Sequence, residues 1–333
     1  MNPSPAPALL TAPLRVGLIG AGGIAHHHLP HLLRLGADVT VHSSHGADEL
    51  VAAYGGTTAA SLPELLERVD VVDVVTPTHT HGELIRTALA HGKHVISEKP
   101  LTRHHRDSLA VVEAAEAAGR FLLPAHVVRF FPEYAQLKSA VDAGLLGDLA
   151  VLRFTRSGAA PTTAAPWFAD EELSGGIIVD QLIHDLDIAR WVAGPVATVS
   201  AATAGKGGVR SAHITLVHHS GAITHVYGEW GAPHLTFSTS FSVTGTDGQL
   251  EHSSRSESTV TEDLDRSGAG GTLVPVVDPT ASPYFLQLRE LTRQLTTGRP
   301  SRVDARDGAE AVRLAVSALE AATTGRPVHL AGA

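Results

Sequence analysis

Three side chains in this sequence have the chemistry to move protons during a reaction. Lys99 stands in the run Ser97-Glu98-Lys99-Pro100, directly before a proline and at the end of an apolar stretch. Asp180 and His184 are four residues apart, so a helix would place them on one face. Imidazole titrates near neutrality, and burial can lower the pKa of a lysine enough for proton transfer. We therefore predict an acid–base site at Lys99, Asp180 and His184, with an ordinary helix-surface pair as the alternative for the last two.

A glycine-rich loop precedes these residues. Gly20-Ala21-Gly22-Gly23-Ile24-Ala25 follows an apolar run and precedes a helical pattern. In the pattern G-x-G-x-x-A the first glycine makes a tight turn, the second lets the backbone approach a pyrophosphate, and the small last residue packs helix against strand. The helix N-terminus adds N–H groups that face the phosphates. The order of strand, loop and helix predicts a dinucleotide site at Gly20, Gly22, Gly23 and Ile24, with a turn that binds nothing as the alternative.

The second predicted strand bears on the choice of dinucleotide. It ends in Thr40-Val41-His42-Ser43-Ser44-His45, without the Asp or Glu that normally holds the ribose diol of NAD. Ser43 and Ser44 could accept a 2′-phosphate, although the usual arginine is also missing. These residues favour NADP over NAD as the cofactor, and ordinary loop residues are the alternative.

The elements that must position these residues fall into two patterns. Residues 14–125 alternate apolar runs with helical patterns, and the predicted strands are 14–19, 39–41, 71–75, 94–96 and 121–123. Such alternation predicts a parallel sheet covered by helices. We therefore expect a disordered tail over 1–12 and an α/β dinucleotide-binding Rossmann domain over 13–127.

The pattern changes after residue 127. A helix is predicted over 132–143 and another over 305–322, and residues 237–244 alternate apolar and polar with period two. Residues 251–273 are rich in Ser, Gly and Asp and are predicted to form a loop. We therefore expect residues 128–333 to form an α+β domain for substrate binding and oligomerisation, built on a large, mainly antiparallel, open-faced sheet.

Composition limits the class of protein. A chain of 333 residues is too long for one typical core and predicts two domains. The formal charge of −9 argues against a nucleic-acid or anionic-membrane surface, and the lack of cysteine excludes thiolate chemistry. The first residues lack the basic and apolar regions of a signal peptide, and no apolar run reaches the roughly 18 residues of a membrane helix. A cytoplasmic protein with no nucleic-acid or membrane partner is expected.

Histidine is abundant, with 21 residues, and raises the question of a metal site. Consecutive residues of a helix point in different directions, so His26-His27-His28 cannot converge on one ion. Asp180, His184 and Asp187 could bind a divalent cation, but that would remove the base from the predicted reaction. We predict no metal. Asp187 could instead contact substrate or pair with Arg190.

The motifs together resemble the Gfo/Idh/MocA family, which includes glucose–fructose oxidoreductase and inositol dehydrogenase. The resemblance covers nearly the whole chain. It is carried by these segments: Gly17 to Ala25, Thr76-Pro77-Thr78-His79-Thr80-His81, Gly92 to Leu101, Arg129-Phe130-Phe131-Pro132, Gly144 to Gly147, Gly175-Gly176 with Asp180 and His184, and Gly245 to Gly248. One departure is Ile177, which stands where many relatives have a third glycine.

The resemblance implies roles for several residues. Thr76, Pro77 and His81 would line the cofactor, Glu98 would lie near the nicotinamide ribose, and the Lys99–Pro100 peptide would be cis. Lys99 and His184 would do the acid–base work with support from Asp180, and either could take the proton. Lys99, Arg129, Trp167, Asp180 and His184 are the candidate substrate contacts. Arg129 could equally join the domains or touch the cofactor, and Trp167 with Phe168 could equally be core.

These expectations favour an NAD(P)-dependent oxidoreductase acting on a secondary alcohol or ketone of a sugar, inositol or related polyol. One alternative is an enzyme that uses tightly bound NAD transiently for glycoside cleavage or internal redox. A second is a non-catalytic cofactor-binding sensor, which predicts loss of the lysine or the histidine. We also expect a homodimer or homotetramer through the open sheet face, since a broad apolar face is costly when exposed.

Overall fold

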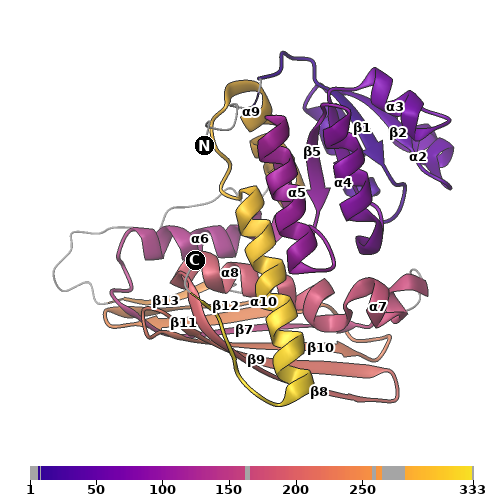
Figure 1. The fold of residues 1–333 in the computed structure, drawn as a ribbon. Helices are drawn as coiled ribbons and strands as arrows, with labels where there is room; N and C mark the ends of the chain where they lie inside the picture. Colours follow the sequence, from indigo (N-terminus) through magenta and orange to yellow (C-terminus); the bar gives the residue numbers. More distant parts are fainter. Residues whose placement is uncertain (1–6, 8, 162–165, 257–259, 265–281, 332–333) are drawn as a thin grey trace. The chain divides into compact units, whose positions relative to one another are not determined.

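The computed structural model of the protein describes residues 7, 9–161, 166–256, 260–264 and 282–331 (Figure 1). The chain forms two compact units. Unit 1 consists of Met1–Phe130 and Thr280–Val312, and unit 2 consists of Phe131–Pro279 and Arg313–Ala333. Each unit has its own sheet and its own buried apolar side chains.

A six-stranded parallel sheet in the order β3-β2-β1-β4-β5-β6 forms the centre of unit 1 (Figure 1). Its strands are β1 (Arg15–Ile19), β2 (Asp38–His42), β3 (Thr57–Thr58), β4 (Val71–Val74), β5 (His94–Glu98) and β6 (Leu122–Ala125). Its connecting helices are α1 (Ala25–Arg34), α2 (Ala47–Tyr54), α3 (Leu62–Arg68), α4 (His81–Ala90) and α5 (His105–Ala118). This is the Rossmann strand order. The chain adds strands on one side of β1 as far as β3 and then returns to add β4, β5 and β6 on the other side, so the strand order switches between β1 and β4.

The apolar runs form these strands because helices cover both faces of the sheet. Val16, Leu18, Val39 and Val41 are completely buried. The five predicted strands are confirmed to within two residues at each end. Strand β3 was not predicted, because it is two residues long and carries only threonines.

Residues 280–312 belong to unit 1, whereas the sequence placed all of 128–333 in the second domain. Helix α9 (Pro283–Thr297) packs against α1, and its Leu288, Leu291 and Leu295 share one apolar core with Leu29 and Leu32. The apolar side of α9 thus completes the core of the first unit, a long-range contact that no local pattern predicts.

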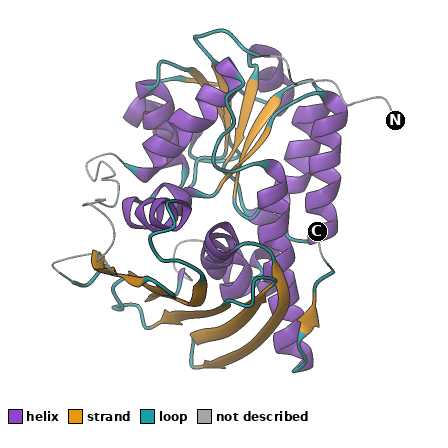
Figure 2. Ribbon diagram, turned by 90° about the vertical axis from the view of Figure 1, so that its left-hand side faces the viewer, coloured by secondary structure: helices purple, strands orange, loops and turns teal. Residues whose placement is uncertain are grey.

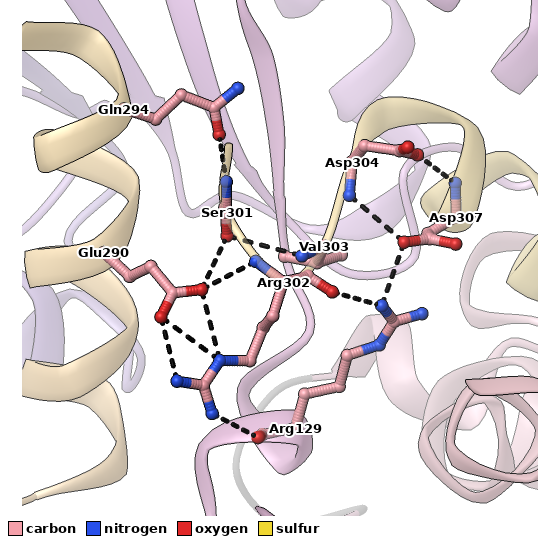
Figure 3. Close-up of polar contacts among 8 residues, drawn as sticks. All are labelled: Arg129, Glu290, Gln294, Ser301, Arg302, Val303, Asp304 and Asp307. Carbon is pink, nitrogen blue, oxygen red and sulfur yellow. Dashed lines mark hydrogen bonds and ion pairs between the residues drawn. The ribbon is translucent and has the colours of Figure 1, made fainter. Parts of the chain in front are cut away.

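A cluster of polar contacts joins this segment to the 3-10 helix Val127–Phe130, which follows β6 (Figure 3). Arg302 donates to Glu290 with 2.9 Å between Nη2 and Oε2, and its guanidinium lies 4.4 Å from the ring centroid of Phe130. Arg129 Nη1 donates to the carbonyl oxygen of Arg302 at 2.6 Å and to Asp307 Oδ2 at 2.9 Å. Asp307 lies in the first turn of α10 (Ala305–Thr324).

Unit 2 is built on a mixed, mainly antiparallel sheet of eight strands in the described part of the chain, in the order β13-β12-β11-β7-β10-β9-β8-β14 (Figure 1). The strands are β7 (Leu149–Ala159), β8 (Val196–Lys206), β9 (Val209–His218), β10 (Ile223–Gly231), β11 (Ser238–Gly245), β12 (Gly248–Ser253), β13 (Val260–Leu264) and β14 (Val328–His329). Strands β7 and β10 pair in parallel and the other neighbours are antiparallel.

Helices of unit 2 lie along one face of this curved sheet (Figure 2). They include α6 (Pro132–Asp142), α8 (Ile183–Ala193) and the second half of α10. Phe241 and Val243 of β11 are buried and their neighbours Ser240 and Ser242 are half-buried, which confirms the predicted alternation within β11. Phe237, predicted on the buried face, instead precedes the strand and is 58% exposed.

The open face differs from the expectation of a broad apolar surface. It carries mainly Ser, Thr and His side chains, and its larger apolar side chains include Val217 and Ile223, which are 38% and 37% exposed. The apolar argument for covering this face was therefore wrong, because alternate positions of β11 are serines rather than aliphatic residues.

Two further expectations need correction. The predicted loop over 251–273 contains the end of β12 and all of β13, which pair antiparallel; residues 257–259 and 265–273 lie outside the described residues. In the predicted tail, residues 1–6 and 8 lie outside the described residues, but the Leu10 N–H donates to the Leu295 carbonyl at 2.9 Å. Within the described ranges, no helix is both long and apolar enough to cross a membrane.

Candidate cofactor and active site

The loop between β1 and α1 has the geometry expected for holding a phosphate group. Gly20 has a φ of +111°, and a Cβ there would lie 2.8 Å from the carbonyl oxygen of Val75, so only glycine fits without strain. A Cβ at Gly22 or Gly23 would meet nothing within 4 Å. The N-cap Ile24 makes no side-chain hydrogen bond to the first turn of α1. The loop therefore fits a pyrophosphate, with open space at the two glycines and a helix N-terminus behind them.

The three residues that follow β2 carry two hydroxyl groups and an imidazole. The N–H of His45 donates to Ser43 Oγ at 3.4 Å, and His45 Nδ1 lies 3.0 Å from Ser44 Oγ. The next carboxylates after this point in the chain are Asp48 and Glu49, in the first turn of α2. The position that selects the cofactor in such folds thus carries Ser43 and Ser44, as the sequence indicated.

The segment after β4 is tied to the segment after β5 by His81. Its Nε2 lies 2.9 Å from the carbonyl oxygen of Thr76 and its Nδ1 lies 2.8 Å from that of Pro100. Burial outweighs these two carbonyl contacts and lowers the pKa of His81. The hydroxyl of Thr80 donates to the Pro77 carbonyl at 2.8 Å and so shapes the same turn. Both ring nitrogens of His81 face backbone oxygens. The predicted contact between His81 and the cofactor would therefore have to be made by its ring carbons.

Lys99 follows the last residue of β5, and its peptide bond to Pro100 is cis, as expected. The Lys99 N–H donates to Glu98 Oε2 at 3.1 Å. The main chain at Lys99 is therefore fixed on one side by the carboxylate of Glu98 and on the other by the bond from His81 to Pro100.

A buried group of three titratable side chains lies beside Lys99 and was missed by the sequence reasoning. His28 Nδ1 lies 2.8 Å from Asp73 Oδ2, and His28 Nε2 lies 3.2 Å from Glu98 Oε1. His28 and Asp73 are 0% exposed and Glu98 is 5% exposed. The signal that could have found the group is Asp73 itself, a carboxylate inside the apolar strand Val71-Val72-Asp73-Val74.

The three consecutive histidines of α1 have three different partners. His26 Nδ1 lies 3.2 Å from the Tyr54 hydroxyl, and the ring of His27 stacks on that of Tyr284 with 4.6 Å between centroids. His28 faces Asp73 and Glu98. The prediction that these histidines point in different directions is confirmed.

In unit 2 the predicted helix with Asp180 and His184 has an unexpected form. Residues Ile177–Leu182 form a π-helix, and α8 begins at Ile183, so Asp180 and His184 lie on either side of a junction rather than on one α-helix. Such π-helical turns are rare and occur often at functional sites. Asp180 and His184 are half-buried, and Asp187 is buried.

A buried ion pair holds this segment on the sheet. Arg156 of β7 binds Asp185 through two hydrogen bonds, Nε to Oδ2 at 2.7 Å and Nη2 to Oδ1 at 3.0 Å. Gln181 Nε2 donates to the Arg156 carbonyl at 3.0 Å. The ion pair is buried and bidentate, and a rotation of α8 that separated Asp185 from Arg156 would leave both charges buried without a partner. Because that is costly, the pair fixes the rotation of α8 on the sheet.

The structure gives context for the other candidate substrate residues. Trp167 and Phe168 are half-buried and stack on each other at 3.9 Å between ring centroids. Arg129 is completely buried and its guanidinium binds Arg302 and Asp307 of unit 1, which gives it a structural role; a substrate contact for it stays a prediction. Lys99 lies in unit 1, whereas Asp180 and His184 lie in unit 2. No cluster of three His, Asp or Glu residues able to hold a metal ion occurs among the described residues.

Comparisons with known proteins agree with this geometry. Residues 14–126 match an oxidoreductase family with an NAD-binding Rossmann fold, and residues 134–251 match a GFO/IDH/MocA C-terminal domain. Myo-inositol 2-dehydrogenase of Thermotoga maritima is 30% identical over 335 residues, covering 95% of this chain and 98% of that protein. Inositol 2-dehydrogenase 4 of Saccharopolyspora erythraea is 35% identical over 190 residues, so the chain spans about half of that relative's length, 54%.

A solved structure shares the fold over nearly the full length. A levoglucosan dehydrogenase in complex with NADH and L-sorbose superposes with a TM-score of 0.84 at 20% identity, covering 95% of this chain and 98% of that chain. At this identity the likeness concerns the arrangement of the elements.

Proposed function

The chain belongs to the Gfo/Idh/MocA family of oxidoreductases, and on this premise we propose that it transfers hydride between a nicotinamide cofactor and a sugar, inositol or related polyol. The observation that carries the proposal is the backbone of the loop after β1. Gly20 has a φ of +111° and lies close to the Val75 carbonyl, and a Cβ at Gly22 or Gly23 would meet nothing within 4 Å. The bound cofactor would take the hydride from a secondary alcohol carbon, or return it to a ketone.

The acid–base groups proposed for this reaction are Lys99, Asp180 and His184. Oxidation of a secondary alcohol also releases the hydroxyl proton, which a base must accept. Lys99 or His184 is the acceptor, and Asp180 orients the hydroxyl or stabilises the imidazolium. Trp167 is proposed as a wall of the substrate site.

NADP is the proposed cofactor in preference to NAD. Ser43 and Ser44 directly follow β2, at the place where a carboxylate would bind the ribose diol of NAD and repel a 2′-phosphate. Their hydroxyls, with the imidazole of His45 beside them, offer hydrogen bonds to that phosphate.

The proposed assembly is a homodimer or homotetramer through the open face of the unit 2 sheet. The row of Ser and Thr side chains on that face would make polar cross-subunit contacts, with Val217 and Ile223 supplying apolar area. Light scattering tests this proposal, and a monomeric mass would remove it.

The experiment that tests the function is a fluorescence titration of the cofactor-stripped protein with NADPH and NADH, followed by turnover with inositols, aldoses and polyols. Tight binding of NADPH with weaker binding of NADH supports the proposed cofactor, and reversed affinities replace NADP by NAD. Binding of neither would overturn the proposal. Binding without net turnover, with cofactor retained through purification, would instead support transient use of the nicotinamide.

A further inference from the structure

The buried group of His28, Asp73 and Glu98 supplies no acid or base to the proposed reaction, yet one of its members, Glu98, directly precedes Lys99 in the chain. Three elements supply it, because His28 lies on α1, Asp73 on β4 and Glu98 at the end of β5. His28 stands between the two carboxylates, 2.8 Å from Asp73 and 3.2 Å from Glu98. Glu98 in turn accepts the N–H of Lys99 through its other oxygen at 3.1 Å.

We propose that His28, oriented by Asp73, is a positioning residue that holds the Glu98 carboxylate ionised and through it fixes the main chain at Lys99. The inference rests on the proposed function, in which Lys99 is catalytic. In this scheme His28 acts only through Glu98.

Charge balance explains why the group needs a histidine. Two carboxylates buried side by side repel, and each is costly to desolvate, so an uncompensated pair would take up a proton. A cation between them offsets part of this cost through its attraction to both charges. Burial by itself would lower the pKa of His28, but the charges of Asp73 and Glu98 outweigh it and raise that pKa to about 10. Burial likewise would raise the pKa of Glu98, but the contact with His28 holds it below its ordinary value.

The other groups around Glu98 do not replace His28 as its buried cation. The pKa of Tyr284, whose ring meets that of His28 edge-on at 6.3 Å, is raised to about 12 by burial and by Glu98, so its hydroxyl stays neutral. The pKa of His81 is lowered by burial, which favours the neutral ring. The charge of Lys99 lowers the pKa of Glu98 by less than His28 does. His28 is therefore the main cation that keeps Glu98 ionised.

A first test requires neither cofactor nor substrate. Histidine NMR of the wild-type protein, with the His28 signal identified by its loss in His28→Gln, should show an imidazolium that persists through pH 8. A His28 signal that titrates near 6.5, the usual value, would overturn the inference whatever the function of the protein.

The kinetic test compares His28→Gln, Asp73→Asn and Glu98→Gln under saturating cofactor. Without the imidazolium, burial raises the pKa of Glu98, so the acidic limb of the kcat profile should move up by about one pH unit or more in His28→Gln. We expect kcat to fall at least tenfold with KM changed less than threefold. Because His28 acts through Glu98, the double variant His28→Gln/Glu98→Gln should be no slower than Glu98→Gln alone.

Control variants separate positioning from general loss of structure. Asp70→Asn removes a carboxylate that precedes the same strand β4 but pairs with Arg15, and His31→Asn removes another histidine of α1. Both should leave kcat and its pH profile unchanged. The inference would be overturned if the losses of kcat in His28→Gln and Glu98→Gln added in the double variant. It would also be overturned if His28→Gln and Asp73→Asn were folded and kept the pH profile of the wild type. If the wild type binds no nicotinamide cofactor, the proposed function fails, and the NMR test still decides the charge of His28.

Discussion

The imidazole of His81 connects to Pro100, with 2.8 Å between Nδ1 and the carbonyl oxygen. His81 is the first residue of α4 and is 1% exposed, and its other ring nitrogen lies 2.9 Å from the Thr76 carbonyl. One buried side chain therefore links the turn after β4, where a dinucleotide would pass, to the segment that carries Lys99. The position of the proposed catalytic lysine depends on a residue 18 positions earlier in the sequence.

Replacing His81 by Phe should destabilise the fold and slow the reaction together. Phenylalanine fills the space but has no N–H, and a neutral imidazole has one, so the buried carbonyl that accepts from His81 loses its donor, which costs about 1–3 kcal/mol in the free energy of unfolding. Because burial lowers the pKa of His81, the stability it supports is present above the unfolded pKa of about 6.5 and is lost as pH falls below it. Urea unfolding at several pH values should show the wild type losing this part in acid and His81→Phe lacking the loss.

The matched control is His91→Gln, at the other end of α4. His91 is exposed and bonds only the Thr87 carbonyl one turn back, so its replacement should change the free energy of unfolding by less than about 0.5 kcal/mol. A His81→Phe protein as stable as wild type at pH 7 would contradict the structural role of His81.

Lys99→Met should bind cofactor and lose turnover. Methionine keeps much of the length and apolar stem but cannot hydrogen-bond the reacting oxygen or exchange a proton, and such groups contribute roughly 10²–10⁴-fold to rate. Cofactor affinity, measured by fluorescence titration, should change less than threefold. Lys93→Met serves as the control, because Lys93 precedes β5 at its other end and bonds the Val69 carbonyl. Retained turnover in Lys99→Met would remove this residue from the mechanism.

Local patterns were sufficient to predict the Rossmann half of the fold and the glycine-rich turn after its first strand. Val16 and Leu18 of β1, with Gly20 directly after them, are set by burial and backbone sterics within a few residues, so a short window contains the signal. The open-faced sheet could likewise be predicted from the alternation along β11. These features depend on neighbours in the sequence.

The features that were missed depend on residues far apart in the chain. His28 and Asp73 are 45 residues apart, and Arg129 and Asp307 are 178 apart, so no window contains either pair. The π-helix over Ile177–Leu182 was also missed, because the i, i+4 spacing of Asp180 and His184 suits an α-helix equally well. Tertiary packing, rather than local preference, decided each of these.

Gly20→Ala should lose cofactor affinity through strain in the loop itself. The new Cβ would lie 2.8 Å from the Val75 carbonyl oxygen, at a φ of +111° that L-residues rarely adopt, so the turn must move. Gly36→Ala is the control, since Gly36 also has a positive φ of +79° but its Cβ would meet nothing within 4 Å. We expect a fall of at least tenfold in affinity for NADPH or NADH in Gly20→Ala. Equal affinities in the two variants would mean that the loop does not bind the cofactor.

Glu290→Gln should weaken unit 1 in a pH-dependent way. Burial alone would raise the pKa of Glu290, but the hydrogen bonds from Arg302 hold it below its ordinary value. A depressed carboxyl pKa stabilises the fold above the unfolded pKa, near 4.5, and this contribution is lost as pH falls through the folded pKa. The variant should therefore be less stable by about 1–2 kcal/mol at pH 7.

The same argument fixes how the difference must change with acidity. The unfolding temperatures of wild type and Glu290→Gln should converge as pH is lowered below 4. The wild-type carboxyl is then also neutral, and it no longer has a charge that attracts the Arg302 guanidinium. Glu64→Gln removes the charge of a half-buried i, i+4 partner of Arg68 but keeps an oxygen that can accept the Ala60 N–H, so it should shift stability by no more than about 0.5 kcal/mol at either pH. A Glu290→Gln deficit that stayed constant from pH 7 to pH 3 would show that packing, and not the charge on Glu290, holds this segment against the 3-10 helix Val127–Phe130.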